Sequence, residues 1–256
     1  MMITEKFIQF VEIAKKLRKE CPWDKEQDHA SIRYNLIEEA YEVVEAIESN
    51  NIKELQRELG DLLLHVIFHS NIAEEKNEFT LEQVLDTITE KLIFRHPHIF
   101  GNTSVKDTDH IKRNWEKLKI EEGRESLLEG VPKHMPSLLR AQRITERASR
   151  AGFDWENVSD VWKKVEEEIN ELQDAIMHKE KEKAEKEFGD LLFSLVNYAR
   201  FIDVHPENAL RRSIEKFIAR FQYIEKKLAE MGKDVPSSSL AEMDSLWNES
   251  KKNLSS

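Results

Sequence analysis

Residues that interrupt helices or cross-link chains are scarce in this sequence. Its single cysteine, Cys21, excludes an intrachain disulfide and a zinc site built from cysteines. Only 7 glycines and 6 prolines are distributed over 256 residues, while glutamate, lysine, leucine and isoleucine are abundant. Since helices tolerate glycine and proline least, we expect an all-α protein with short connections.

Long apolar segments and an excess of positive charge are missing as well. No stretch approaches the roughly 18 uncharged apolar residues of a membrane-spanning helix. The N-terminal segment carries charges at Glu5, Lys6 and Glu12, unlike a secretory signal. The net charge of −11 argues against binding to nucleic acid or to an anionic membrane. We therefore expect a soluble, cytoplasmic protein with neither kind of partner.

A pattern of five carboxylates occurs twice in the chain. Glu38, Glu39, Glu42, Glu58 and Asp61 recur 129 residues later as Glu167, Glu168, Glu171, Glu187 and Asp190. The flanking segments 59–73 and 188–202 match too, and Lys91 and Arg95 correspond to Lys216 and Arg220. The repeat predicts two tandem copies of a four- to five-helix unit. We place the first copy at residues 1–120, a linker at 121–136 and the second copy at 137–256.

The spacing of the carboxylates predicts that they converge. In segment 36–47 the apolar residues form one broad arc that should face a core, and Glu39 and Glu42 lie at its edge. Two helices folded as an antiparallel hairpin would bring these acids to Glu58 and Asp61, and the second copy repeats the arrangement. The apolar run after Asp61 predicts a deeply buried second helix. Gly60 and Gly189, each costing about 1 kcal/mol against alanine inside a helix, suggest close helix approach.

Clustered carboxylates need a neutralising partner. Two ionised carboxylates about 4 Å apart repel by up to about 4 kcal/mol at an effective dielectric constant near 20. Oxygen ligands alone favour a hard cation, so we predict Mg²⁺, for which Mn²⁺ can substitute. Solvated acidic helix faces are the alternative, which the recurrence disfavours. A di-iron bundle would need Glu-x-x-His motifs, which do not accompany these acids. His65 and His69 have no histidine counterparts and are interpreted as packed or hydrogen-bonded.

Basic residues of the second copy suit a phosphate ligand of such a metal site. Lys216 and Arg220 lie one turn apart on the same helix face and can grip phosphate oxygens. Lys164 precedes the second acidic motif and can reach the same place. Trp247, which corresponds to Trp115, can stack on a base or pack against a helix. The sequence leaves this last choice open.

Five motifs together resemble the MazG family of nucleoside triphosphate pyrophosphohydrolases, within the all-α NTP pyrophosphatase superfamily. They are CPWD (21–24), LIEEAYEVVEAI (36–47), ELGDLLLHVIFH (58–69), FRHPHIFG (94–101) and GFDW (152–155). The resemblance covers essentially the whole chain. It implies Mg²⁺-dependent hydrolysis of nucleoside triphosphates to nucleoside monophosphate and diphosphate, with broad base tolerance. It also implies a homodimer and a housecleaning role in the nucleotide pool.

The resemblance further implies that the second copy is the main catalytic one. Its metal ligands would be Glu168, Glu171, Glu187 and Asp190, and its nucleotide-binding residues Lys164, Lys216, Arg220 and Trp247. Glu167 is a candidate general base. The first copy keeps a candidate second site with Glu38, Glu39, Glu42, Glu58, Asp61, Lys91 and Arg95, but Asn35 stands in place of Lys164, so its activity stays open. The alternative function is a non-catalytic helical scaffold that binds a protein partner.

Overall fold

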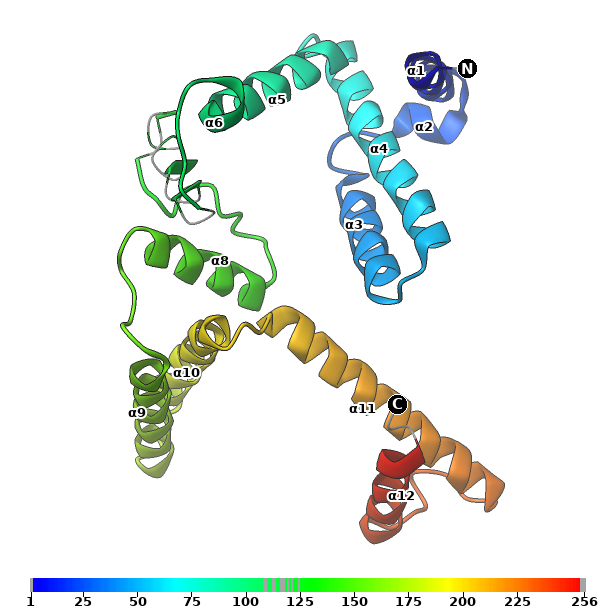
Figure 1. Cartoon of the computed structure of the whole chain (residues 1–256). Coiled ribbons are helices and arrows are strands. Elements are labelled where there is room, and N and C mark those ends of the chain that lie inside the picture. Colours follow the sequence, from blue (N-terminus) through cyan, green and yellow to red (C-terminus); the bar gives the residue numbers. More distant parts are fainter. Residues whose placement is uncertain are drawn as a thin grey trace. The chain divides into compact units, whose positions relative to one another are not determined.

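The computed structural model describes residues 2–107, 110–111, 114–115, 118, 120, 122–123 and 125–253. Every regular element within these residues is a helix, which confirms the all-α class (Figure 1). The chain divides into two compact units, Met1–Ser104 and Val105–Ser256, and each is described by itself. The boundaries of the two copies and of the linker, where Glu121 and Arg124 lie outside the described residues, stay a prediction.

The first unit is built around a hairpin of two long helices. Its helices are α1 (Ile3–Glu20), α2 (Pro22–Glu26), α3 (Arg33–Glu48), α4 (Ile52–Glu75), α5 (Leu81–Arg95) and α6 (Pro97–Phe100). Helices α3 and α4 pack along each other, and α1 packs on α4 (Figure 1). The turn between α3 and α4 reverses the chain through Asn50, whose φ is 53°. The side chain of Asn51 then caps α4 by accepting a hydrogen bond from the backbone N–H of Glu54.

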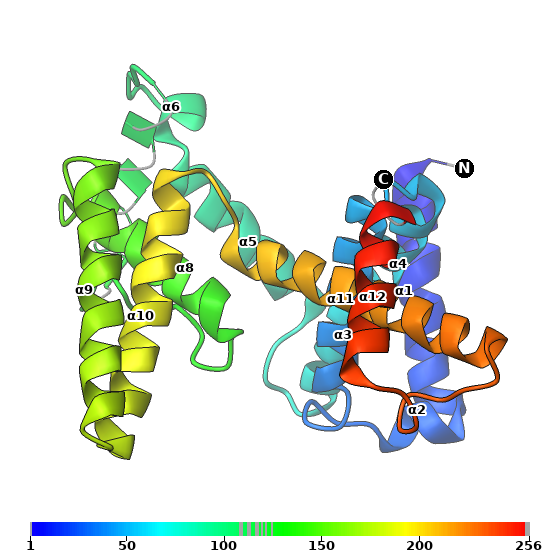
Figure 2. The same ribbon diagram turned by 90° about the horizontal axis from the view of Figure 1, so that it is seen from below.

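The second unit repeats this hairpin. Its described helices are α8 (Ser137–Arg150), α9 (Val158–Met177), α10 (Lys181–Phe201), α11 (Pro206–Glu230) and α12 (Leu240–Asn253). Helices α9 and α10 lie side by side, and α8 packs against α10 (Figure 2). Lys179, 129 residues after Asn50, has a φ of 58° in the turn between α9 and α10. The two hairpins therefore share their turn conformation as well as their carboxylates.

Three helix starts follow the sequence signals. Thr80 and Gln83 form a reciprocal capping box at α5, and Ser239 and Glu242 form one at α12. Pro206 occupies the first turn of α11. Residues within one turn of each start therefore account for where these helices begin. No helix in the described part of the chain combines the length and apolarity that crossing a membrane requires.

The predicted deep burial of the second hairpin helix is only half right. Ile67, Phe68 and Ile72 of α4 are buried, but Leu63 and Val66 remain 40% and 43% exposed. The reason is that α1 and α3 cover only part of the circumference of α4. The apolar arc of α3 is likewise incompletely covered, since Ile37 is half exposed. Apolar periodicity predicts that these faces are suited to burial, not that this chain buries them.

The prediction that Gly60 and Gly189 mark a close helix approach is wrong for the described chain. A Cβ atom built on either glycine would meet no atom within 4 Å beyond its own helix backbone. Both residues lie inside long helices and have helical backbone conformations. Neither glycine is therefore required by a neighbouring helix of the same unit.

We expect Gly60→Ala and Gly189→Ala each to raise the free energy of unfolding by up to about 1 kcal/mol, because alanine loses less backbone entropy in a helix. Chemical denaturation followed by circular dichroism measures the change. Gly152→Ala is the matched control and should destabilise, since Gly152 has a φ of +93°. Destabilisation by the helical substitutions would instead indicate that another chain packs closely on these glycines.

Candidate active site

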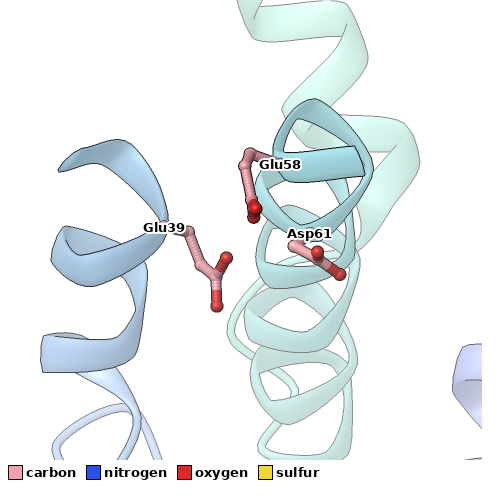
Figure 3. Close-up of side chains that lie close together, drawn as sticks. All are labelled: Glu39, Glu58 and Asp61. Atoms are coloured by element: carbon pink, nitrogen blue, oxygen red, sulfur yellow. The ribbon is translucent and has the colours of Figure 1, made fainter. Parts of the chain in front are cut away.

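The α9–α10 hairpin gathers three of the predicted metal ligands. Glu168 and Glu171 on α9 and Glu187 on α10 each offer a carboxylate oxygen, and these oxygens lie within 4.8 Å of one another. The α3–α4 hairpin gathers Glu39, Glu58 and Asp61 in the same way. Figure 3 shows Glu39 reaching from α3 towards the two acids on α4. Convergence of the carboxylates is therefore present twice, once in each unit.

The carboxylates of the second cluster are held at the margin of the core. Glu168 is 5% exposed and Glu187 is 4% exposed, so their carboxylates are largely removed from water. Glu168 Oε1 accepts a charge-assisted contact from Lys164 Nζ at 2.8 Å, while Glu168 Oε2 is buried without a hydrogen-bond partner among the described residues. A buried carboxylate oxygen without a donor is costly unless a cation meets it. The residues present therefore fit a hard divalent cation.

Proximity changes the ionisation of the second cluster. Burial together with the negative charges of Glu168 and Glu187 raises the pKa of Glu171 above its ordinary value. Hydrogen bonds to Glu167 and Glu168 raise the pKa of Lys164 far above its usual range, so this lysine stays charged. Lys164 therefore neutralises part of the cluster.

The first cluster is neutralised differently. Asn35 stands at the position of Lys164, and the cation that contacts Glu58 is its neighbour Arg57, at 2.6 Å. Burial and the charges of Glu42 and Asp61 raise the pKa of Glu39. A side-chain hydrogen bond with Glu58, together with burial, raises the pKa of Glu42 above its ordinary value. Arg57, which is exposed, is thus the cation beside this cluster, whereas Lys164 takes that role in the second unit.

Several predicted residues lie outside the two triplets. Asp190 is not among the three converging acids of its hairpin, and Lys186 lies 3.8 Å from its carboxylate. Glu167, the candidate base, is exposed and contacts Lys164 Nζ at 2.7 Å. In the first unit, Glu38 and Glu42 are not members of the triplet. The structure thus brings together three of the four expected ligands in the second copy and three of the five acids named for the first.

Two of the predicted nucleotide-binding residues, Arg220 and Trp247, form a separate cluster at α11 and α12. The guanidinium of Arg220 lies 5.5 Å from the centre of the Trp247 ring, and Phe217 lies 5.2 Å from the same ring. Trp247 also packs against Ile224 and its buried neighbours. Within the described residues, no hydrogen bond or ion pair links Lys216 or Arg220 to the carboxylates of α9 and α10. Their counterparts Lys91 and Arg95 lie on α5.

The histidines of α4 are packed against a third histidine. The rings of His69 and His29 are stacked with centroids 5.1 Å apart, and their Nδ1 atoms are 2.8 Å apart. Such a contact needs one nitrogen to donate and the other to accept. His65 Nδ1 is buried without a hydrogen-bond partner among the described residues. Burial lowers the pKa of both His65 and His69, which keeps these rings neutral.

The sequence reasoning missed a cavity beside the second cluster. It has a volume of about 710 Å³ and is lined by residues of α8, α9 and α10 and of segment 152–155. Glu168, Asp190 and Lys164 form part of its wall, as do Asn197 and Arg200. A position-by-position comparison of the copies could have drawn attention to it. Asn197 and Arg200 are replaced in the first copy by Phe68 and Asn71.

A family model describes both hairpins. The MazG nucleotide pyrophosphohydrolase domain matches residues 27–100 and again residues 156–224. The chain belongs to the MazG family. The first match spans α3 to α6, and the second contains α9, α10 and most of α11. The duplicated carboxylate hairpins are therefore two copies of one MazG domain.

Curated MazG-family relatives align with nearly the full chain. The nucleoside triphosphate pyrophosphohydrolase/pyrophosphatase MazG of Thermotoga maritima is 41% identical over 250 residues, which is 96% of this chain and 95% of that protein. A nucleoside triphosphate pyrophosphohydrolase of Escherichia coli K12 is 38% identical over 91% of this chain and 90% of its own length. A Bacillus subtilis protein, YabN, is 42% identical over 98% of this chain and 52% of its own length.

The raised pKa of Glu171 makes stability depend on pH and on divalent ions. Without a divalent ion, ionised Glu171 destabilises the folded state at pH 7, and this penalty disappears as the pH falls through its raised pKa and below its ordinary value. We therefore expect Glu171→Gln to melt at a higher temperature than the parent chain at pH 7 in EDTA, with the gain vanishing near pH 4. Thermal denaturation at both pH values measures it.

At neutral pH, divalent ions should stabilise the parent chain more than Glu171→Gln, opposite to the difference expected in EDTA. We expect Mn²⁺ to raise the melting temperature of the parent chain more than that of Glu171→Gln, because a ligand stabilises the state that binds it. Asp174→Asn, an exposed substitution on the same helix, is the control and should respond like the parent. Equal Mn²⁺ responses in all three proteins would contradict a metal ligand at Glu171.

Proposed function

We propose that this chain is a nucleoside triphosphate pyrophosphohydrolase, which cleaves the bond between the α- and β-phosphates and releases nucleoside monophosphate and diphosphate. The observation that carries the proposal is the triplet of Glu168, Glu171 and Glu187, with a buried carboxylate oxygen that lacks a donor. The names of the Thermotoga and Escherichia relatives support the same activity. We further propose broad specificity for ribo- and deoxynucleotides, ATP included, and a housecleaning role in the nucleotide pool.

Magnesium is the proposed cofactor, with manganese as a substitute. Glu168, Glu171 and Glu187 would hold it, and Asp190 is proposed as the fourth ligand. When bound, such an ion withdraws electron density from phosphate oxygens and offsets the charge that develops on them. Lys164 stays charged beside the acids and can meet a phosphate oxygen of the substrate. Glu167 is proposed as the general base, with its carboxylate available at the exposed side of Lys164.

Lys216, Arg220 and Trp247 are proposed to contact the nucleotide from a second copy of the chain. Two of them, Arg220 and Trp247, form a cluster of their own at α11 and α12, apart from the carboxylates of α9 and α10. Helix α11 also exposes an apolar face, with Phe217 at 57% and Leu210 at 51% exposed. A homodimer would bury such faces and can place the cations of one subunit at the carboxylates of the other. We propose this arrangement for the active enzyme.

The first copy is proposed to be a weaker second site. Glu39, Glu58 and Asp61 are close enough to share a divalent ion, and Glu38 and Glu42 flank them. Lys91 and Arg95 on α5 are the corresponding candidates for phosphate binding. The missing lysine at Asn35 argues that turnover depends mainly on the second copy. A cytoplasmic location and the absence of nucleic-acid and membrane partners stay predictions.

The activity is tested by incubating the chain with Mg²⁺ and a panel of canonical, deoxy and oxidised triphosphates, while assaying diphosphate and orthophosphate separately. We expect diphosphate, and we expect Glu168→Gln to lower kcat at least about 100-fold, because it removes charge that acts on the reacting phosphate. Glu39→Gln, the matched change in the first copy, should keep most of the activity. Circular dichroism checks that both variants remain helical.

The other outcomes separate the alternatives. Orthophosphate as the product would indicate a different phosphohydrolase. Release of neither product would favour the non-catalytic helical scaffold that binds a protein partner. Full activity in Glu168→Gln would contradict the assignment of the metal site to α9 and α10.

A mixing experiment tests whether the site is shared between subunits. Glu171→Ala and Arg220→Ala should each be inactive alone. We expect a mixture of the two, after subunit exchange, to recover part of the parent activity, because one site of each heterodimer would keep both residues. Size-exclusion chromatography confirms that dimers are present. A mixture as inactive as its components would show that Glu171 and Arg220 do not act across a dimer.

A further inference from the structure

The cavity beside the second carboxylate cluster has the position and size of a ligand pocket. Its volume of about 710 Å³ falls within the roughly 300–1,000 Å³ range of pockets for small molecules. Lys164, Glu168 and Asp190 lie in its wall. A molecule in the cavity that carried a phosphate chain could therefore extend that chain towards the proposed metal site.

The rest of the wall is mainly apolar and includes aromatic residues. Trp155 comes from the segment before α9, Phe193 from α10, and Ile144 and Val161 from α8 and α9. Such surfaces suit the planar, apolar faces of a nucleobase. The polar residues of this part of the wall are Thr145, Asp154, Ser194, Asn197 and Arg200. The hydroxyls of Thr145 and Ser194 donate to backbone carbonyls of their own helices.

The hydrogen bonds of Arg200 fix the orientation of Asn197. Arg200 Nε and Nη2 donate to Asn197 Oδ1 at 3.3 and 3.1 Å. Because a guanidinium has donors only, the amide oxygen must face it. Arg200 is anchored in turn by Asp154, whose Oδ2 accepts from Nη1 at 2.9 Å. The amide nitrogen of Asn197 is thus a fixed donor, and it makes no hydrogen bond to another described residue.

The first copy provides a natural comparison, since its corresponding positions are filled. Phe68 stands in place of Asn197 and Ile32 in place of Val161, and both are buried. They form one apolar cluster with Ile72, and Leu64 packs against it. The two hairpins therefore keep the same acids but differ in the space beside them. A ligand that binds only in the second copy would need this open space, which Phe68 occupies in the first copy.

We propose that this cavity holds the nucleoside part of the substrate and that the Asn197 amide nitrogen donates a hydrogen bond to an acceptor on the base. The proposal deepens the proposed function and rests on it for the direction of the phosphates. Every nucleobase carries an acceptor on its edge, so the donor of Asn197 by itself does not select one base strongly. Broad base tolerance and a built pocket are therefore compatible.

Two substitutions of Asn197 test the pocket. Asn197→Asp keeps the oxygen that faces Arg200 but replaces the donor by an acceptor. Asn197→Phe copies the first copy and fills the space. We expect Asn197→Asp to weaken binding of dTMP about tenfold or more, as loss of a matched hydrogen bond in a built site does. Asn197→Phe should abolish detectable dTMP binding. Isothermal titration measures binding without requiring turnover.

The controls separate the pocket from the metal site. Binding of Mn²⁺ and inhibition by inorganic diphosphate should change less than about twofold in both variants, because neither ligand contains a base. Gln173→Glu adds the same charge as Asn197→Asp at an exposed position of α9 and should bind dTMP like the parent. Melting curves show whether each variant is folded. If Asn197→Phe does not fold, the dTMP affinity of Asn197→Asp alone tests the pocket.

The remaining results would overturn the proposal. Parent-like dTMP affinity in folded Asn197→Asp and Asn197→Phe would exclude the cavity as the nucleoside site. Loss of dTMP binding only in Trp247→Ala would place the base on Trp247 instead. If the parent chain binds dTMP through Asn197 but releases no diphosphate from any triphosphate, the pocket stands and the proposed hydrolysis fails.

Discussion

Repulsion between carboxylates held together at the edge of a core is the constraint on which both units depend. The α3–α4 and α9–α10 hairpins bring acids within 4.8 Å of one another, and folding alone does not favour such a grouping of like charges. Each unit relieves it differently. Lys164 enters the second cluster, whereas Arg57 contacts Glu58 in the first. A divalent ion can replace either solution, which links folding stability to the site.

The two copies keep the clustered acids but differ in the residues beside them. The acids and the left-handed turn residues Asn50 and Lys179 occupy equivalent positions. The residues beside the acids do not, since Phe68 fills the place at which Asn197 borders a cavity. Packing Phe68 against Ile32 strengthens the core of the first unit at the expense of ligand space. The second unit keeps that space, so catalysis and structural support can be divided between the copies.

Local sequence was sufficient to predict the helices and the convergence of acids, because capping and i, i+3 spacing act within one or two turns. Thr80 with Gln83, and Glu58 with Asp61, are examples. It did not predict that Asp190 is not one of the three converging acids, since this depends on the rotation of α10 against α9. The cavity was missed for a similar reason. Its walls come from segments that are distant in sequence, α8, segment 152–155 and α10, and they meet only in the folded chain. No pattern in the sequence indicates that the space between them is left unfilled by side chains.

Apolar periodicity also predicted more burial than one chain provides. Phe217 and Ile214 on α11, and Leu92 on α5, have the spacing of core residues, yet each is about half exposed. An apolar helix face predicts that the face is buried, but not whether the same chain or a second chain buries it. If a second subunit covers α11, the contact that buries Phe217 also positions Trp247, which packs against Phe217, and Arg220, whose guanidinium lies over the Trp247 ring. Subunit association, stability and completion of the phosphate site would then be one coupled equilibrium, so activity per chain should fall on dilution together with the melting temperature.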